Sequence, residues 1–184
     1  MSRATSSFAV LLGLLLVLGG CATTQGARQT SDGWMVRMVR AGNTEHKVSW
    51  ITGSPGASWQ RDPARTADVA WTHRDLAATI YSDTTCGSRY DDVPLTVLVN
   101  HLTFGFEDLK TEEQVEVDLA ERGALRRVFS ATLDGRPVKL ASTVIKKGPC
   151  IFDLVYVTAQ PDRFTDGWDA YMAVLDGLAI RVAR

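Results

Sequence analysis

The sequence predicts an α+β domain in which a central antiparallel β-sheet is covered by helices on both faces. Tight turns at 134–135 (Asp-Gly) and 148–149 (Gly-Pro) join three consecutive apolar segments that have the length of strands. The register imposed by these turns leaves apolar side chains on both faces of the sheet, so both faces have to be covered. Segments 91–106 and 161–177 carry apolar residues at helical spacing and are available as covers.

The first half of the chain holds shorter strand signals. Residues 46–51 (HKVSWI) predict a strand, and the Gly/Pro/Ser-rich segment behind it predicts a loop. Segments 67–73 and 77–86 flank a turn at 73–76 and predict a hairpin. Residues 113–120 (EQVEVDLA) alternate between polar and apolar and predict one more strand.

The strands 125–133, 136–147 and 150–158 follow, and their turns fix which side chains share a face. One face holds Phe129, Ala131, Val138 and Leu140, and the opposite face holds Ile145, Phe152, Leu154 and Tyr156.

Each predicted helix has a recognisable beginning. Asp92 is the expected N-cap of the first helix and Pro94 lies in its first turn, while Pro161 lies in the first turn of the second. Gly177 ends or interrupts the second helix. The apolar stripes are Leu95, Leu98, Val99, Leu102 and Phe106 in the first helix and Phe164, Trp168, Tyr171, Met172 and Leu175 in the second.

This order of strands and helices over residues 46–177, with the run DGRPVKLASTVIKKGPCIFDLVYVTAQPDRF, resembles the PsbP-like (Mog/PsbP) fold. That fold is shared by photosystem II extrinsic subunits, Ran-binding Mog proteins and small bacterial lipoproteins, including some of delta-proteobacterial type. The resemblance implies an α/β/α sandwich that binds or scaffolds rather than catalyses. No site residue of the family matches this sequence, so none is carried over.

The N-terminus predicts export and a lipid anchor. Residues 1–20 contain Arg3 and an apolar run from Phe8 to Leu18, which suits a signal peptide and is too short for a spanning helix. The sequence Leu-Gly-Gly before Cys21 resembles the lipobox of bacterial lipoproteins, whose cysteine is acylated. The alternative is an ordinary secretory signal with a cysteine at its boundary by chance.

The predicted organisation is a signal peptide at 1–20, the lipidated Cys21 with a flexible tether at 21–33, and one globular domain at 34–184. The protein would then face the periplasm from a bacterial membrane. Ala22, where an Asp would favour the inner membrane, favours the outer membrane by resemblance to enteric lipoproteins. The expected partners are the membrane, through the anchor, and an envelope protein.

Composition supports a folded domain and gives no sign of nucleic acid binding. Residues 1–20 contain one basic and no acidic residue, so the remaining 164 residues carry 19 basic and 21 acidic side chains. This balance has no basic excess of the kind that nucleic acid attracts.

Export leaves two cysteines, Cys86 and Cys150, in an oxidising compartment. Both lie at strand ends beside turns, and we expect them to form a disulfide. The alternatives are two buried free thiols and, with less support, a catalytic thiol.

No catalytic, metal or cofactor site is predicted. His73, Arg74 and Asp75 spell the HRD of kinase catalytic loops, but the Gly-rich loop and DFG are missing, and a hairpin turn is the better interpretation. Residues 53–56 (GSPG) resemble a nucleophile elbow without its strand and helix. His46, His73 and His101 lack metal-ligand spacing, so a metal site would need the fold to gather them.

The remaining polar and aromatic candidates have ordinary structural explanations. The acids Glu107, Asp108, Glu112, Glu113, Glu116 and Asp118 predict a solvated edge, Lys146 and Lys147 an exposed turn, and Trp50, Trp59 and Trp71 core packing rather than a ligand groove. The predicted function is a non-catalytic binding or accessory module in an envelope transport or assembly complex. The alternative is an envelope hydrolase with an unrecognised site.

Overall fold

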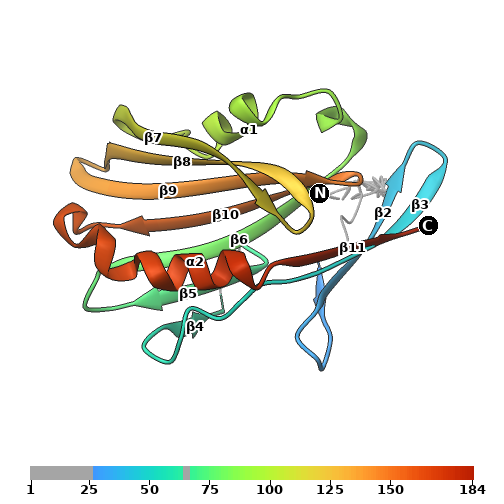
Figure 1. The fold of residues 1–184 in the computed structure, drawn as a ribbon, viewed down its shortest axis with the longest axis horizontal. Coiled ribbons are helices and arrows are strands. Elements are labelled where there is room, and N and C mark those ends of the chain that lie inside the picture. The colour runs from blue at the N-terminus through green and yellow to red at the C-terminus, as the bar shows by residue number, and fades with distance from the viewer. Residues whose placement is uncertain (1–26, 64–66) are drawn as a thin grey trace, which may run out of the picture.

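A computed structural model describes residues 27–63 and 67–184, which form two antiparallel sheets, two α-helices and two 3₁₀ helices (Figure 1). The predicted signal peptide and Cys21 lie outside the described residues. The elements are β1 (Arg28–Gln29), β2 (Met35–Ala41), β3 (Thr44–Ile51), β4 (Gln60–Asp62), β5 (Val69–His73), β6 (Ala78–Cys86), η1 (Ser88–Tyr90), α1 (Leu95–His101), β7 (Glu107–Leu119), β8 (Arg122–Leu133), β9 (Arg136–Lys147), β10 (Cys150–Thr158), η2 (Pro161–Gly167), α2 (Trp168–Asp176) and β11 (Ala179–Ala183).

The main sheet has seven strands in the order β4-β5-β6-β10-β9-β8-β7. Its register confirms the predicted hairpins, because Phe129 pairs with Leu140 and Ile145 pairs with Phe152. Asp134, at φ 50°, and Gly135, at φ 72°, make the tight turn between β8 and β9. Local turn chemistry therefore set this register, as the sequence predicted.

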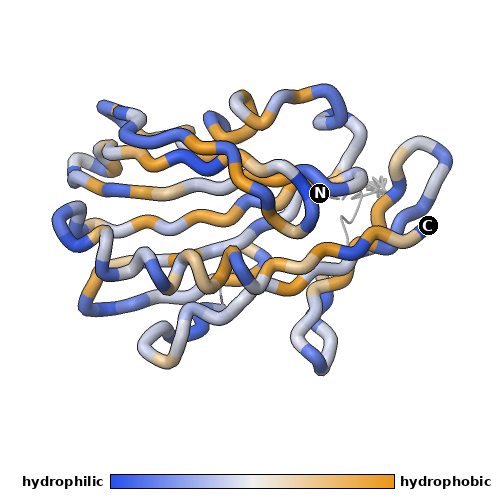
Figure 2. Tube along the Cα trace, viewed as in Figure 1, coloured by the Kyte–Doolittle hydropathy of each residue, from blue (hydrophilic) through white to orange (hydrophobic). Residues whose placement is uncertain are grey.

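The apolar side chains of the main sheet separate into two clusters, as the predicted faces require. Ile145, Phe152, Leu154 and Tyr156 join a large cluster with α2, while Phe129 and Leu140 join a smaller one with Leu98 and Val99 of α1. Figure 2 shows the hydrophobic residues concentrated along the central strands and α2. The class is α+β, as predicted. However, α1 has only seven residues, and these contacts do not amount to the predicted helical layers over both faces.

Both helices are shorter than the sequence predicted. Pro94, not Asp92, occupies the N-cap of α1, and Gly105, at φ 89°, follows a turn that has already left the helix. In the second segment, 161–167 is a 3₁₀ helix. There the Tyr156 hydroxyl donates to the Phe164 carbonyl over 2.9 Å, and a Cβ at Gly167 would collide with the Tyr156 ring.

The sequence did not predict the second sheet, which has the order β1-β2-β3-β11. This sheet pairs strands that are far apart in the sequence, since Ile180 of β11 pairs with Trp50 of β3. The domain also begins earlier than predicted. Arg28 and Gln29, placed in the tether by the sequence, pair with β2, and Thr30 donates to the Trp34 carbonyl. The paired strands therefore reach back to Arg28, inside the segment that the sequence assigned to the tether.

Two glycines allow α2 to contact the loop that follows β3. The Gly53 amide donates to the Val174 carbonyl over 3.1 Å, and a Cβ at Gly177 would overlap the Gly53 backbone. This contact fixes the end of α2 against the small sheet. Among the described residues, no helix is both long enough and apolar enough to cross a bilayer.

Candidate functional site

The three histidines lie on separate elements. His46 is on β3, His73 on β5 and His101 on α1. The His73 ring packs edge-on against Trp59, with 5.3 Å between centroids. Within residues 27–63 and 67–184, no three His, Cys, Asp or Glu side chains are arranged to hold a metal ion.

The HRD sequence lies at the turn between β5 and β6, as the hairpin interpretation predicted. The Arg74 carbonyl accepts from the Ala77 amide, and the Asp75 carbonyl accepts from Arg163 over 2.9 Å. These contacts involve the backbone and hold the turn against η2, so they have a structural role.

The tryptophans mostly form core. Trp50 and Trp59 are buried, and Trp50 packs edge-on against Phe152. Trp71 is half-buried under the Arg61 guanidinium, which lies 5.2 Å from the ring centroid. Trp50 and Trp71 also line a cavity of about 270 Å³ between the two sheets.

Cys86 and Cys150 form the predicted disulfide. They lie directly opposite each other on β6 and β10, with Cα atoms 4.0 Å apart. The bond joins β6 to β10, the central strand of the main sheet, at one end, which gives these cysteines a structural role.

Lys146 and Lys147 are not freely exposed, which corrects the sequence interpretation. Lys147 donates to the Ala120 carbonyl over 2.9 Å, and Lys146 donates to the Asp91 carbonyl over 2.6 Å and to the Val93 carbonyl over 3.2 Å. Both ammonium groups thus satisfy carbonyls at the ends of neighbouring segments.

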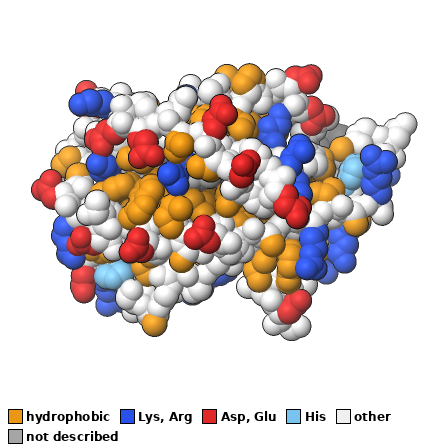
Figure 3. Space-filling view, in the orientation of Figure 1, with side chains coloured by type: hydrophobic (Ala, Val, Ile, Leu, Met, Phe, Trp, Pro, Cys, Tyr) orange, Lys and Arg blue, Asp and Glu red, His pale blue; other side chains and the backbone are white. Residues whose placement is uncertain are grey.

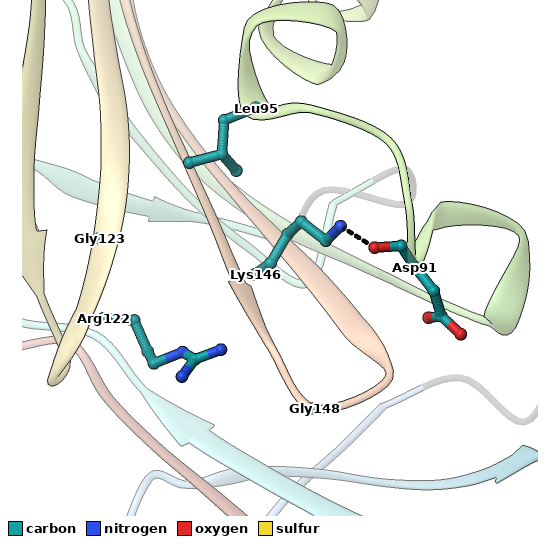
Figure 4. Close-up of a pocket in the computed structure, with 6 residues that line it drawn as sticks. All are labelled: Asp91, Leu95, Arg122, Gly123, Lys146 and Gly148. Atoms are coloured by element: carbon teal, nitrogen blue, oxygen red, sulfur yellow. Dashed lines mark hydrogen bonds between the residues drawn. The ribbon is translucent and has the colours of Figure 1, made fainter.

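Lys146 also lines a cavity of about 500 Å³ with Asp91, Leu95, Arg122, Gly123 and Gly148 (Figure 4). In Figure 4 the Lys146 side chain points toward the Asp91 carbonyl, and Arg122 stands on the far side of the 148 turn. The Lys146 ammonium is already hydrogen-bonded to the backbone that leads into α1. Arg122 is therefore the one exposed cation among the described lining residues, and few polar groups of the cavity point toward a common ligand position.

A second cavity, of about 470 Å³, has a more distinctive lining. It lies over β4, β5, β6 and β10, and the described residues that line it include three carboxylates and no basic side chain. We define this acidic cavity by its lining residues, which are Asp62, Ala67, Ala70, Thr79, Tyr81, Asp83, Leu102 and Asp153.

The strand register places two of these carboxylates together. Asp83 of β6 and Asp153 of β10 are directly opposite, so their side chains leave the sheet on the same face. Their neighbours Phe152 and Leu154 point into the large cluster on the other face. Leu102, just after α1, lines the cavity from above the strands.

The electrostatics of the cavity follow from burial and like charge. Burial, followed by the charge of Asp83, raises the pKa of Asp153 to about 7. Burial, followed by the charges of Asp153 and Asp83, also raises the pKa of Tyr81 to about 12. Near neutral pH, Asp153 is therefore close to half-protonated, and the cavity favours any ligand that brings positive charge.

Sequence reasoning missed this pair and considered other acids instead. Glu112 and Glu113 lie on the exposed edge strand β7, as predicted, where they form ion pairs with Lys139 at 2.6 Å and Arg126 at 3.5 Å. The available signal was a charged residue inside each of two strands, AATIYSDTTC and CIFDLVYVT. A carboxylate within an apolar strand needs a special environment.

Comparisons with known proteins find similar folds among solved structures but no matching sequence family. No family model matches the chain, and no curated protein matches it in sequence. Among solved structures, LpqN, described as involved in cell envelope biogenesis of Mycobacterium tuberculosis, superposes with a TM-score of 0.55 at 14% identity, covering 80% of this chain and 91% of LpqN. Cyanobacterial PsbP (CyanoP) from Synechocystis sp. PCC 6803 gives a TM-score of 0.51 at 8% identity, covering 79% and 92%.

These similarities support a PsbP- and LpqN-like fold, in agreement with the resemblance in the sequence. At 14% and 8% identity they establish the fold alone.

Proposed function

We propose that this chain is an envelope lipoprotein, anchored through Cys21, whose periplasm-facing domain is a non-catalytic binding module. The lipobox-like sequence, the Cys86–Cys150 disulfide and the fold shared with LpqN support this location. We further propose that the lipid anchor lies in the outer membrane and that the domain works as part of an envelope transport or assembly complex. Cross-linking in intact cells, followed by mass spectrometry of the tagged protein, tests for the partner.

The observation that carries the binding proposal is the acidic cavity. In the proposed arrangement α1 and α2 lie on opposite faces of the main sheet, and the short α1 leaves its face open over β5 and β6. A volume of about 470 Å³ suits a small molecule. Among the described residues, Asp62, Asp83 and Asp153 line it and no basic side chain does, so the ligand that we propose is a small organic cation such as a protonated amine.

Matched probes test this proposal. Putrescine should stabilise the protein against heat, whereas 1,4-butanediol, its neutral analogue of similar shape, should not. The effect should be larger at pH 8 than at pH 6, because an amine binds best when Asp153, with a pKa of about 7, has lost its proton.

Substitutions locate the effect in the cavity. Asp83→Asn combined with Asp153→Asn should abolish stabilisation by putrescine, and Asp169→Asn, on the exposed part of α2, should leave it intact. Equal shifts from both probes, or a putrescine shift that survives the double substitution, would rule out the cavity as an amine site.

A second function has one specific observation in its favour. Two opposed carboxyl groups, one of which (Asp153) has its pKa raised to about 7, can act as a general acid and a general base, as in many hydrolases. Assays with p-nitrophenyl glycosides and esters address this function. Turnover that is lost in both Asp83→Asn and Asp153→Asn would make hydrolysis the better assignment.

A further inference from the structure

Charged residues divide unevenly between the two sheets. Segments 28–51 and 179–184, which contain the four strands of the small sheet, carry six basic and two acidic side chains. The other described residues carry 12 basic and 19 acidic side chains. The small sheet is thus a positively charged unit on an otherwise negative domain. Such asymmetry favours an anionic partner.

The basic side chains of the small sheet gather on its outer face. Met35, Trp50 and Ile180 are paired neighbours, and all three are buried, so they mark the inner face. Residues that alternate with them point outward, and Glu45 is the one acid among the strand residues there. We call this outer surface the basic face; its strand residues are Arg28, Val36, Met38, Arg40, Glu45, Lys47, Ser49, Ile51, Ala179, Arg181 and Ala183.

The basic face also has an apolar component. Met38 is 47% exposed although it lies in mid-strand. Beside the strands, Trp34 stacks under the Arg181 guanidinium, 4.2 Å from the ring centroid. In Figure 3, Lys and Arg side chains lie next to hydrophobic ones at the end of the molecule formed by β2, β3 and β11. Cationic side chains mixed with Trp and Met are typical of surfaces that rest at a lipid–water interface.

The chain brings this face close to the proposed anchor. Only six residues, 22–27, separate Cys21 from Arg28, which pairs with β2 at the edge of the small sheet. Fully extended, they allow at most about 25 Å between the two Cα atoms. The small sheet is therefore the part of the domain with the shortest tether to the acylated cysteine.

We propose that the basic face docks on a bilayer surface containing anionic phospholipids. This inference rests on the proposed anchor at Cys21, because acyl chains hold the face at high effective concentration near the headgroups. Arg28, Arg40, Lys47 and Arg181 supply the attraction, and Met38 and Trp34 lie where they can enter the interface. Docking in this orientation leaves the opposite end of the main sheet, with the β5–β6 and β8–β9 turns, pointing away from the membrane.

The test uses the chain from residue 22, which keeps every strand and helix of the described residues and carries no acyl group, so docking is separated from anchoring. Co-sedimentation with phosphatidylcholine vesicles is compared with vesicles that contain about 30% phosphatidylglycerol, at low and at physiological salt. We expect binding to the anionic vesicles at least about tenfold stronger than to the neutral ones, and weaker as salt rises.

A matched pair of triple variants locates the docking surface. Arg40→Glu/Lys47→Glu/Arg181→Glu should reduce vesicle binding at least about tenfold. Arg74→Glu/Lys110→Glu/Arg136→Glu makes the same charge change at exposed positions on the main sheet and its turns, and should retain more binding. Near-UV circular dichroism verifies folding of each variant.

Three results would overturn the proposal: no binding of the unmodified chain to anionic vesicles at low salt, equal binding to neutral vesicles, or equal losses in the two variants. A failure of acylation at Cys21 would appear separately, in palmitate labelling of intact cells. A failure of the amine site would leave vesicle binding unchanged.

Discussion

Asp83 and Asp153 lie directly opposite each other on the adjacent strands β6 and β10, in a cavity that no basic side chain of the described residues lines. Two carboxylates in such an arrangement repel, and burial adds to the cost of ionising Asp153. The protein thus keeps a locally unfavourable feature in the middle of its main sheet. Features of this kind concentrate at functional sites.

The carboxylate pair predicts how stability changes with pH. Because the pKa of Asp153 is raised from 3.8 to about 7 in the folded protein, the folded state holds this proton more tightly than the unfolded chain does. The contribution of Asp153 is therefore most favourable below about pH 4 and is lost as pH rises toward 7, by at most about 1.4 kcal/mol per pH unit.

Asp153→Asn should remove this dependence and raise the urea midpoint at pH 8 more than at pH 5. Urea unfolding of the parent, Asp153→Asn and the control Asp169→Asn at both pH values measures the effect. A difference between parent and Asp153→Asn that is the same at pH 5 and pH 8 would contradict the raised pKa.

The disulfide predicts a large loss of stability on removal. Cys86 and Cys150 are 64 residues apart, and a loop of that length corresponds to about 4 kcal/mol in the chain-entropy treatment. Cys86→Ser/Cys150→Ser should lower the free energy of unfolding by up to this amount. Intact mass after alkylation without reductant checks the bond itself, because two alkylated thiols at these positions in native protein would show that it does not form.

A buried hydrogen-bond network at Tyr171 predicts a specific cost. The Tyr171 hydroxyl donates to the Leu154 carbonyl over 3.0 Å and shares a 2.6 Å hydrogen bond with the Thr143 hydroxyl. Tyr171→Phe should destabilise by about 1–3 kcal/mol, since it leaves the Thr143 hydroxyl buried without a partner. Thr143→Val in the same chain should recover part of the loss, and chemical denaturation of all three variants tests this. A larger loss in the double variant would argue against the network.

The glycine contact between α2 and the loop after β3 predicts a steric effect. In Gly177→Ala the new methyl group would meet the Gly53 backbone, which is held by its hydrogen bond to Val174. We expect a loss of about 1–3 kcal/mol, typical of overpacking. The control is Gly123→Ala, because a methyl group at that position meets open space. Gly135→Ala would not serve as a control, because Gly135 has a positive φ. Thermal unfolding that is unchanged by Gly177→Ala would refute the contact.

The anchor prediction depends on Cys21 and the residues before it. Cys21→Ala should yield an unprocessed precursor that takes up no labelled palmitate. Processing and labelling like those of the parent would exclude a lipoprotein. This outcome would leave the fold and the acidic cavity unaffected.

Local sequence signals predicted the part of the fold that depends on neighbouring residues. The Asp134-Gly135 turn fixed the β8–β9 register, and the alternation on either side fixed the two faces. The helix 91–106 was overestimated because apolar spacing continues past Thr103 and Gly105, where the backbone turns away.

Features that depend on distant pairing were missed. The small sheet closes through the distant pairing of β3 with β11, and its first main strand was missed because MVRMVRA at 35–41 shows no clear period of two, although it pairs with the neighbouring β3. Asp83 and Asp153 are also far apart in the sequence, so no local pattern near either residue indicates that their strands pair. The disulfide was predictable because compartment and cysteine count left few alternatives.

The pairing of β11 with β3 sets an order of events during biogenesis. Ile51 and Ala179 are partners although they lie 128 positions apart, so the small sheet closes only after residues 179–183 have been delivered. In an exported chain, strands β1–β3 would reach the membrane surface first and would remain without their partner β11 until the rest of the domain had been exported. A tag or truncation at the carboxyl end would then disturb the small sheet, which contains the amino-terminal strands and lies nearest the proposed anchor.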